Sequence, residues 1–491
     1  RAAQAGLLAT SDNVAGANVD GYVRRAPDIK TYGLGANNDL SGPSFAVEGF
    51  GRFFDSHLES QVLAQSARTV FSTTISESTT VLDGMLTSSS TGLAAGLGAF
   101  ANAAGSLVNQ PSSVAFSQSL IGSATELATR IRSYATEIDR IKANAMDGLS
   151  SALNEVNSLA PQLAKINIQI RGASVPGSSP APEILDERDR VLSKIQDLIG
   201  GNARIDGDGT ASIALGGMIV VDKYGANIFS DMDGVFPIPS GTAPDQLRLR
   251  IAEGPNKQPV LAPLAMPPIT KIVDGKSVSI SGPSFFSSGK AGGYLYLATD
   301  FCAETKRMLD VFAASLFYYV NGAKNAAGSP VSPLFEFRSS NGGAALRDPV
   351  ALDGLFKKPS GSATEYFNFN EIVEMVNPHS PNYSPVAAAV LDSVSTSSFF
   401  GVPSLGVVDP SAFDGPAAKS IEELRTPLGN ALATFVSSTA TTLSSWKNET
   451  VSNGRLLAGL KAQKESLSGV SLDEEAANLL KYQQTYNASS K

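Results

Sequence analysis

The feature that most constrains the fold is a long run of apolar residues between positions 120 and 170. They recur at alternating intervals of four and three, beginning with Leu120 and Ala124 and continuing, with one slip, to Ile170. This spacing places them on one face of a helix that packs against other helices. At 1.5 Å per residue the helix is about 75 Å long, which favours a rod or bundle over a compact globule. Pro161 interrupts the run and predicts a kink.

Helical spacing occupies both ends of the chain, whereas the middle differs. Residues 201–297 lose the helical period and contain short β-prone runs between glycine-rich turns, such as Ala211–Leu215 and Met218–Val221. We therefore expect an α+β multidomain protein: an elongated helical bundle or coiled coil built from both chain ends, with inserted mainly-β domains. The expected domains are an N-terminal axial segment with an extended linker (1–50), the N-terminal part of a helical rod (51–200), a β domain (201–297), a helix returning to the rod (298–321), a mixed Pro/Gly-rich insertion (322–427) and the C-terminal part of the rod (428–491).

Composition narrows the classes of partner. The chain has 491 residues and a net charge of −8, without the Lys/Arg runs that follow a phosphate backbone, so we expect no nucleic-acid partner. No stretch reaches the roughly 20 apolar residues of a membrane span, so we expect no membrane partner. The single cysteine, Cys302, lies in an apolar helical pattern, and we interpret it as a core thiol rather than a nucleophile.

Catalytic and metal-binding patterns are missing. His57 and His379 are isolated in the sequence and cannot build a common zinc site with one cysteine. There is no nucleophile elbow, phosphate loop or dinucleotide fingerprint. The segment Asp206–Gly209 lacks the spaced acidic ligands of a calcium loop and favours a hairpin turn. We expect neither an enzyme nor a bound cofactor.

The last helix has a clear start. Ser471 and Glu474 form the S-x-x-E pattern of a capping box. Along this last helix, a 4-3-4-3 spacing predicts a seam against a partner helix; it is formed by Leu472, Ala476, Leu479, Gln483 and Tyr486. The pattern alone is equally consistent with an ordinary intramolecular coiled coil.

On the earlier helix 183–199, Asp186 and Arg190 lie one turn apart and can form an ion pair.

Four segments carry a family resemblance. The stretch Asn13–Arg24 matches N-x-x-x-x-N-x-x-G-Y-x-R, which resembles the start of flagellar rod, hook and hook-associated proteins. Residues 468–488 are similar to the closing motif of the family of the first hook-associated protein, FlgK. Leu97–Ser113 agrees with that family, and Ile184–Leu192 resembles its L-L-D-Q-R-D-x-L-L signature, with Glu187 where Gln is common. The resemblance covers roughly residues 1–200 and 428–491.

The resemblance implies a structural subunit of the bacterial flagellum at the hook–filament junction. Such proteins are exported unfolded through the flagellar type III apparatus and form a homo-oligomeric ring outside the cell. The implied partners are the hook protein, the second hook-associated junction protein and an export chaperone at the C-terminus. Terminal helices would line the inner core and order on assembly. The interface candidates are Asn13, Asn18, Gly21, Tyr22, Arg24, Leu472, Glu474, Asn478, Tyr482, Gln483, Gln484 and Tyr486.

Three other classes remain open at this point. The first is another flagellar axial protein, such as the hook protein or the second junction protein. The second is a secreted coiled-coil adhesin, which would normally show repeats or an anchor. The third is a peptidoglycan hydrolase, which would need a Glu/Asp cleft within 201–427. Helical periodicity runs to both ends of the sequence, and we expect the family's outermost terminal helices to be cut short here.

Overall fold

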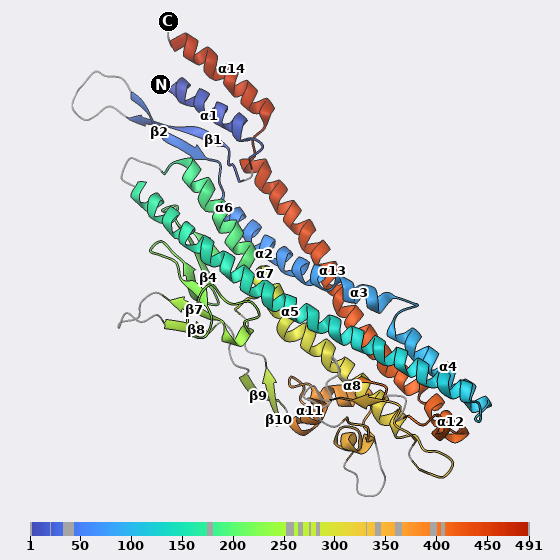
Figure 1. Ribbon diagram of the computed structural model, residues 1–491. Helices are drawn as coiled ribbons and strands as arrows, with labels where there is room; N and C mark the ends of the chain where they lie inside the picture. Colours follow the sequence, from blue (N-terminus) through green and yellow to red (C-terminus); the bar gives the residue numbers. More distant parts are fainter. Residues whose placement is uncertain are drawn as a thin grey trace.

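The molecule is an elongated rod of long helices, with small sheets along one side and a separate unit at one end (Figure 1). It is known from a computed structural model, which confirms the α+β class. The structure describes residues 2–19, 21–32, 44–173, 180–251, 260–263, 269–273, 276–280, 285–329, 331–338, 345–358, 366–392, 400–403 and 408–489.

The rod is built around α5 (Val114–Ala173), the predicted long helix. Its 60 residues span about 90 Å, and the element continues through Pro161 as one helix. The run that begins with Leu120 and ends with Ile170 is buried along its length, because α4, α6, α7 and α8 pack on it. The other rod helices are α2 (Ser56–Ser78), α3 (Thr80–Thr87), α4 (Leu93–Asn109), α6 (Pro182–Ile199), α7 (Gly289–Tyr296), α8 (Cys302–Asn321) and α13 (Arg425–Ser468).

The helix that returns to the rod begins earlier than the sequence pattern indicates. It starts at Gly289 instead of 298, and a π-helical turn, η2 (Leu297–Phe301), joins α7 to α8. Cys302 follows this turn and is only 1% exposed, as predicted for a core thiol.

Small antiparallel sheets lie beside α5. Strands β4 (Ala211–Leu215) and β5 (Met218–Val221) confirm the two predicted β runs, and Asp206–Gly209 forms the predicted hairpin turn before β4. Asn167 of α5 fastens this sheet, because its buried amide bonds the backbone of Ala211 in both directions. The remaining elements are β3 (Asn202–Ile205), β6 (Ile228–Ser230), η1 (Pro244–Gln246), β7 (Arg248–Ile251), β8 (Val260–Pro263), β9 (Ile269–Val273) and β10 (Lys276–Ile280).

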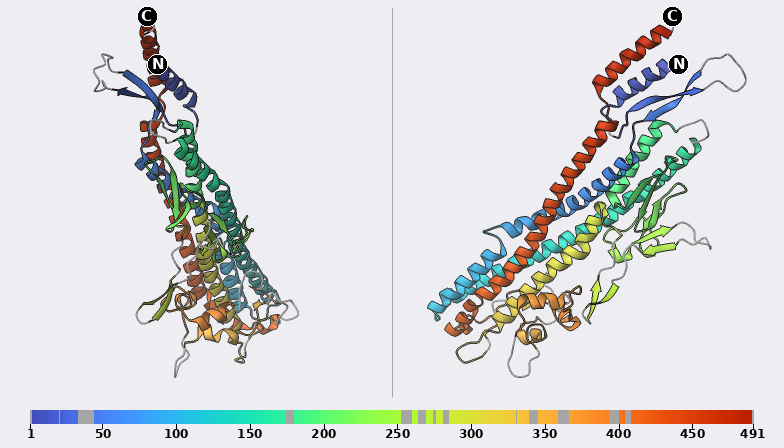
Figure 2. Two further views of the ribbon diagram at one scale, coloured as in Figure 1. Left: turned by 90° about the vertical axis from the view of Figure 1, so that its left-hand side faces the viewer. Right: turned by 180° about the vertical axis from the view of Figure 1, so that it is seen from behind.

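Short elements of the mixed insertion cover the far end of the rod (Figure 2). They pack on α4, α5 and α8, and the residues of α8 from Val311 to Leu316 are almost completely buried. These elements are β11 (Glu336–Phe337), η3 (Pro349–Leu352), α9 (Asp353–Phe356), α10 (Phe369–Val376), α11 (Pro385–Asp392), β12 (Phe400–Gly401), η4 (Pro410–Ala412) and α12 (Gly415–Glu423).

The opposite end carries a separate small assembly, which we call the terminal unit. It consists of α1 (Ala2–Gly16), the antiparallel strands β1 (Arg25–Tyr32) and β2 (Ser44–Arg52), and α14 (Leu472–Ser489). Both chain ends lie here, and α1 and α14 run side by side in opposite directions (Figures 1 and 2). The helix α13 reaches the unit from the rod and ends at Ser468, with Gly469 as its C-cap.

Candidate assembly site

The terminal helix pair packs through small residues on α1. The buried residues of α1 are Ala3, Gly6, Ala9, Thr10, Asn13 and Gly16. Of these, Gly6 and Asn13 contact α14. The ring of Tyr482 lies directly on Gly6, where an added Cβ would meet it at 2.4 Å. Small side chains at this spacing allow the two helices to approach closely, so α1 is shaped to receive the larger side chains of α14.

The seam predicted on α14 is rotated from the one that forms. Leu479 is half-buried as expected, but Leu472 is 55% exposed, and Ala476 and Gln483 are exposed as well. The face that meets α1 instead includes Glu475, which is 1% exposed, and the half-buried Tyr482. The predicted seam ranked positions by apolar character, whereas the contact with α1 is made through a buried carboxylate. A seam against a helix of another chain stays a prediction.

Asn13 is the centre of a buried hydrogen-bond network. Its side-chain amide donates to the carbonyl oxygen of Arg25 and to Oε2 of Glu475, at 3.0 and 3.1 Å. Its Oδ1 accepts from the hydroxyl of Tyr22 and from the backbone N–H of Arg25, each at 2.9 Å. The side chain is 1% exposed and its amide is fully used. This one residue therefore joins the helix, the following turn and the C-terminal helix.

The turn after α1 brings Tyr22 back onto the helix. Gly21 has φ +79°, a left-handed conformation that favours glycine, and the Tyr22 ring then covers Gly16, where an added Cβ would lie 2.5 Å from it. The guanidinium of Arg25 lies over the Tyr22 ring, 4.7 Å from the ring centroid. Burial raises the pKa of the Tyr22 hydroxyl to about 12, against the opposing influence of Arg25. Asn18 lies exposed in the same turn.

Arg24 connects this turn to the start of α14. Its Nε donates to Oε1 of Glu475 and its Nη1 to Oε2 of Glu474, both at 2.9 Å. Its backbone N–H donates to the carbonyl oxygen of Ser468 at the end of α13. The Glu474 N–H donates to Ser471 Oγ at 3.4 Å, which is the forward half of the predicted capping box.

A second charged cluster joins the terminal unit to the rod through α6. Arg25 pairs with Glu183 and, at 2.8 Å, with Asp186. Arg52 of β2 pairs with Asp186 at 2.9 Å and with Asp189 at 2.6 Å. Burial raises the pKa of the Asp186 carboxyl, while the hydrogen bond from Arg25 and the charge of Arg52 lower it.

The expected pair between Asp186 and Arg190 does not form. Arg190 is exposed and pairs with Glu187, while Asp186 turns toward the terminal unit. The i,i+4 spacing predicted the pair from local geometry, but the long-range arginines compete successfully for the carboxylate.

Most of the predicted interface residues either make contacts within the chain or are exposed to solvent. Asn13, Tyr22, Arg24, Glu474 and Tyr482 make contacts within the chain, as described above. Asn478 is half-buried on α14, beside this face. Gly21, Asn18, Leu472, Gln483, Gln484 and Tyr486 are exposed. The sequence prediction missed Glu475, Arg25, Arg52, Asp186 and Asp189.

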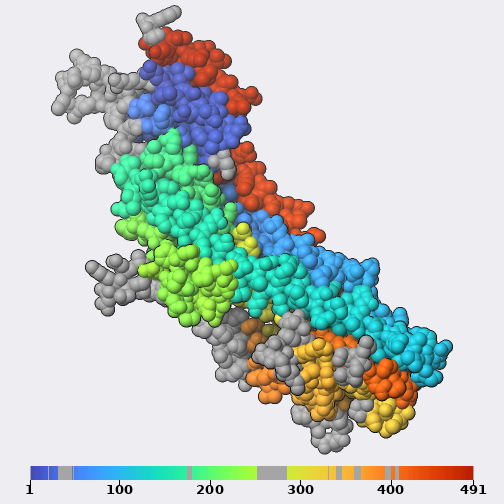
Figure 3. All heavy atoms as spheres, viewed as in Figure 1, coloured from blue at the N-terminus to red at the C-terminus, as the bar shows by residue number. Residues whose placement is uncertain are grey.

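Both helices of the pair carry exposed apolar side chains. The exposed fractions are 59% for Leu8 and 46% for Val14 on α1, and 55% for Leu472, 58% for Leu480 and 41% for Tyr486 on α14. Figure 3 shows these two helices side by side at the end of the molecule. Exposed apolar side chains on both helices are suited to packing against further helices.

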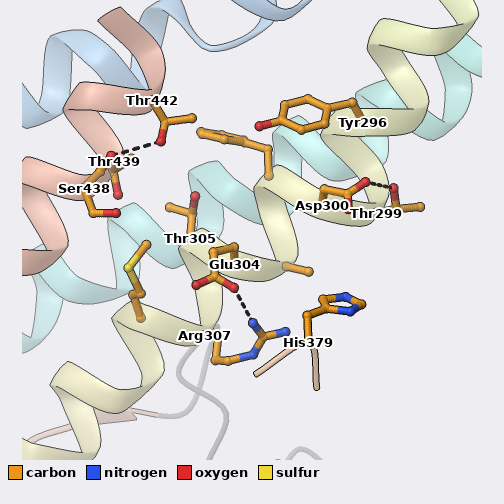
Figure 4. A pocket seen from close by; sticks show the side chains of 13 residues that line it. Tyr296, Thr299, Asp300, Glu304, Thr305, Arg307, His379, Ser438, Thr439 and Thr442 are labelled. Atoms are coloured by element: carbon orange, nitrogen blue, oxygen red, sulfur yellow. Dashed lines mark hydrogen bonds and ion pairs between the residues drawn. The ribbon is translucent and has the colours of Figure 1, made fainter. Parts of the chain in front are cut away.

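A separate pocket lies in the rod between α8 and α13. It encloses about 260 Å³, and His379 reaches it from the segment between α10 and α11 (Figure 4). Asp300 accepts a hydrogen bond from Thr299, and Glu304 pairs with Arg307. Both carboxylates are therefore engaged within the chain, and we assign no catalytic role to either.

Across the described parts of the chain, His, Cys, Asp and Glu side chains do not gather in threes as a metal site would require. Nor does any described helix combine the length and apolar character needed to cross a membrane.

Comparison with known protein families gives a consistent match. Residues 79–329, half of the chain, match the model of the flagellar hook-associated protein FlgK helical domain. This segment includes most of the rod and the β strands beside it.

Individual relatives extend the match to nearly the whole chain. Flagellar hook-associated protein 1 of Escherichia coli is 22% identical over 99% of this chain and 94% of its own length. The protein of the same name from Salmonella typhimurium is 23% identical with the same coverage, and that of Bacillus subtilis is 25% identical over 48% of each chain. The structure of the flagellar hook junction protein FlgK from Burkholderia pseudomallei is similar with a TM-score of 0.44, at 18% identity, over 57% of this chain and 47% of that one.

Proposed function

The chain belongs to the family of the flagellar hook-associated protein FlgK, and from this membership we propose that it is a structural subunit at the junction between the flagellar hook and filament. The observation that carries the proposal is the family match, which spans the rod and, in individual relatives, both termini. The alternatives of a hook protein, a secreted adhesin or a peptidoglycan hydrolase have no comparable support.

The terminal unit is the part of this chain that we propose as the assembly element. Its two helices are joined by Asn13 and Glu475, and they leave apolar side chains, such as Leu8 and Leu480, exposed. Exposed apolar surface of this kind is normally covered in a protein's working state. Neighbouring copies of the same chain would cover it in a homo-oligomeric ring, with the hook protein and the second junction protein as the adjoining partners.

The exposed apolar side chains of α14 also need to be covered before the chain is exported. A chain that leaves the cell through the flagellar export apparatus travels unfolded, and its apolar C-terminal residues would be exposed in the cytoplasm. We propose that a chaperone covers the segment containing Leu472, Leu480 and Tyr486 before export. Export would place the assembled protein outside the cell, as part of the flagellum.

Deleting the gene in its flagellated host tests the junction role. The deletion strain is expected to carry hooks without filaments and to release flagellin into the medium, because the filament lacks its attachment ring. The wild-type gene should restore filaments. Normal filaments in the deletion strain would overturn the proposal.

A pair of variants tests the proposed surface. Leu480→Asp places a charge on the outward side of α14 and should abolish restoration of filaments while leaving the circular-dichroism spectrum and the melting temperature unchanged. Lys481→Asp, at the neighbouring exposed position, is the matched control and should restore filaments. Full activity of Leu480→Asp would contradict an assembly role for this surface.

A further inference from the structure

Among the residues that the structure describes, the terminal unit and the rod share no cluster of buried apolar side chains. The two clusters of buried apolar side chains begin, along the sequence, at Leu63 and end at Leu443, and the partly buried residues that extend them reach only to Trp446. The described residues of α1, β1, β2 and α14 contribute to neither cluster. The position of the terminal unit on the rod therefore depends on something other than apolar burial.

Charged side chains occupy the place where such a core would lie. Arg25 and Arg52 are 6% and 5% exposed, and their partners Asp186 and Asp189 are 15% and 8% exposed. Arg188 of α6 joins the same cluster, because it pairs with Asp189 at 2.5 Å. In the described parts of the chain, the connection also includes the linking segments and the bond from Arg24 N–H to the Ser468 carbonyl. The Phe54 ring lies there too, with the guanidinium groups of Arg52 and Arg188 at 5.0 and 5.7 Å from its centroid.

Two consecutive residues bind different parts of the molecule, one the terminal unit and the other the rod; we call these two parts the two bodies. Arg24 binds Glu474 and Glu475 at the start of α14, within the terminal unit. Arg25, the next residue, binds Glu183 and Asp186 on α6, within the rod. The backbone of Arg25 is in turn held by Asn13 of α1. A change in the angle between the two bodies must therefore break bonds of this dipeptide.

We propose that Arg25 and Arg52 are positioning residues that set the orientation of the terminal unit on the rod, with Asp186 as their shared anchor. Buried hydrogen-bonded ion pairs are directional, so they select one arrangement even where they add little net stability. The proposal deepens the assembly role above, since a fixed orientation presents the outward helix faces at one angle to neighbouring copies.

Distance measurement between spin labels tests the orientation directly. In the full chain with Cys302→Ala, labels at Lys165→Cys on α5 and Lys481→Cys on α14 report the angle between the bodies, and both positions are exposed. A second pair, Ser11→Cys with Lys481→Cys, reports the packing inside the terminal unit.

Asp186→Asn removes the shared charge with little change in shape. We expect it to replace the narrow distance peak between α5 and α14 by a broad distribution, while the distance within the terminal unit stays narrow. Arg52→Gln removes the partner charge and should broaden the α5–α14 distance distribution in the same way. It replaces Asp186→Asn as the test variant if Asp186→Asn folds poorly. Arg190→Gln removes an exposed pair from the same helix and should change neither distance.

The proposal is overturned if Asp186→Asn and Arg52→Gln each keep the narrow distance peak between α5 and α14. It is also overturned if the two distances broaden together, since the charges would then hold the helix pair itself. Neither result touches the junction role, which fails only if cells lacking the gene still build normal filaments.

Discussion

At the residue scale, the terminal unit depends on polar groups that are buried because they are paired. Asn13 and Glu475 are 462 positions apart in sequence, yet each is 1% exposed and they share a hydrogen bond. The resemblance to axial proteins drew attention to Asn13, Tyr22 and Arg24. It did not identify Glu475, because an acidic residue in the first turn of a helix is already explained by the helix dipole. The partner of a buried side chain is a property of the tertiary structure, which one sequence does not reveal.

Replacing Asn13 by Ala should loosen the terminal unit selectively. The substitution deprives the buried Glu475 carboxylate of a donor and removes the acceptor of the Tyr22 hydroxyl, which we expect to lower local stability by about 1–3 kcal/mol. Hydrogen exchange should become faster in α1 and α14 and stay unchanged in α5. Asn18→Ala, at an exposed position of the same turn, is the control. Equal exchange in the two variants would contradict the account.

Tyr22 predicts a specific alkaline sensitivity. Its pKa is raised by burial from 10.0 to about 12, so the native state holds the proton more tightly than the unfolded chain. The stability that this contributes is complete below pH 10 and is lost as the pH rises toward 12. The free energy of unfolding, measured with urea, should fall more steeply over this range in the wild type than in Tyr22→Phe. Parallel curves would show that the hydroxyl is not buried.

At the scale of elements, the reliability of a sequence pattern followed the amount of burial. The 4-3 spacing from Leu120 to Ile170 predicted α5 correctly, because helices pack against that face along its whole length. The weaker pattern on α14 did not indicate the face that contacts α1, since α1 offers glycine and amide groups there. The insertion at 322–427 could not be assigned because its helices are short, eight or nine residues in α10, α11 and α12. They depend on packing against α8, α4 and one another.

The close contact between Gly6 and Tyr482 gives a test of the helix pair. Gly6→Ala places a methyl group 2.4 Å from the ring, and overpacking of this kind costs about 1–3 kcal/mol. Gly122→Ala in α5 meets nothing within 4 Å and should instead stabilise the protein by about 0.5–1 kcal/mol. Thermal unfolding and hydrogen exchange measure both. A stabilising Gly6→Ala would show that the two helices are not in contact.

At the scale of the whole molecule, two bodies of unequal stability are joined by charges. The rod contains both apolar cores, while the terminal unit contains small buried residues such as Ala3 and Ala9 and a polar network. The sequence indicated correctly that helices from both chain ends lie together. It did not indicate that α1 and α14 form their own unit, because the boundary is made by long-range contacts of Arg25 and Arg52.

Exchange rates should therefore differ between the bodies. In the monomer we expect amide protons of residues 472–487 to exchange much faster than those of α5, because few apolar contacts hold them. In the assembled flagellum the same residues should become protected, since neighbouring copies cover their outward faces. Strong protection of residues 472–487 in the monomer would contradict ordering on assembly.

Cross-linking within assembled flagella tests the central claim that the outward faces of the terminal helices join neighbouring subunits. Cells would express two forms in equal amounts, both with Cys302→Ala, one carrying Leu8→Cys and the other Leu480→Cys. A short bifunctional thiol reagent can then link these positions only between two copies. We predict cross-linked dimers from isolated flagella and none from the monomeric mixture. Full incorporation of both forms without any cross-linked product, while cysteines on the rod do cross-link, would contradict the account.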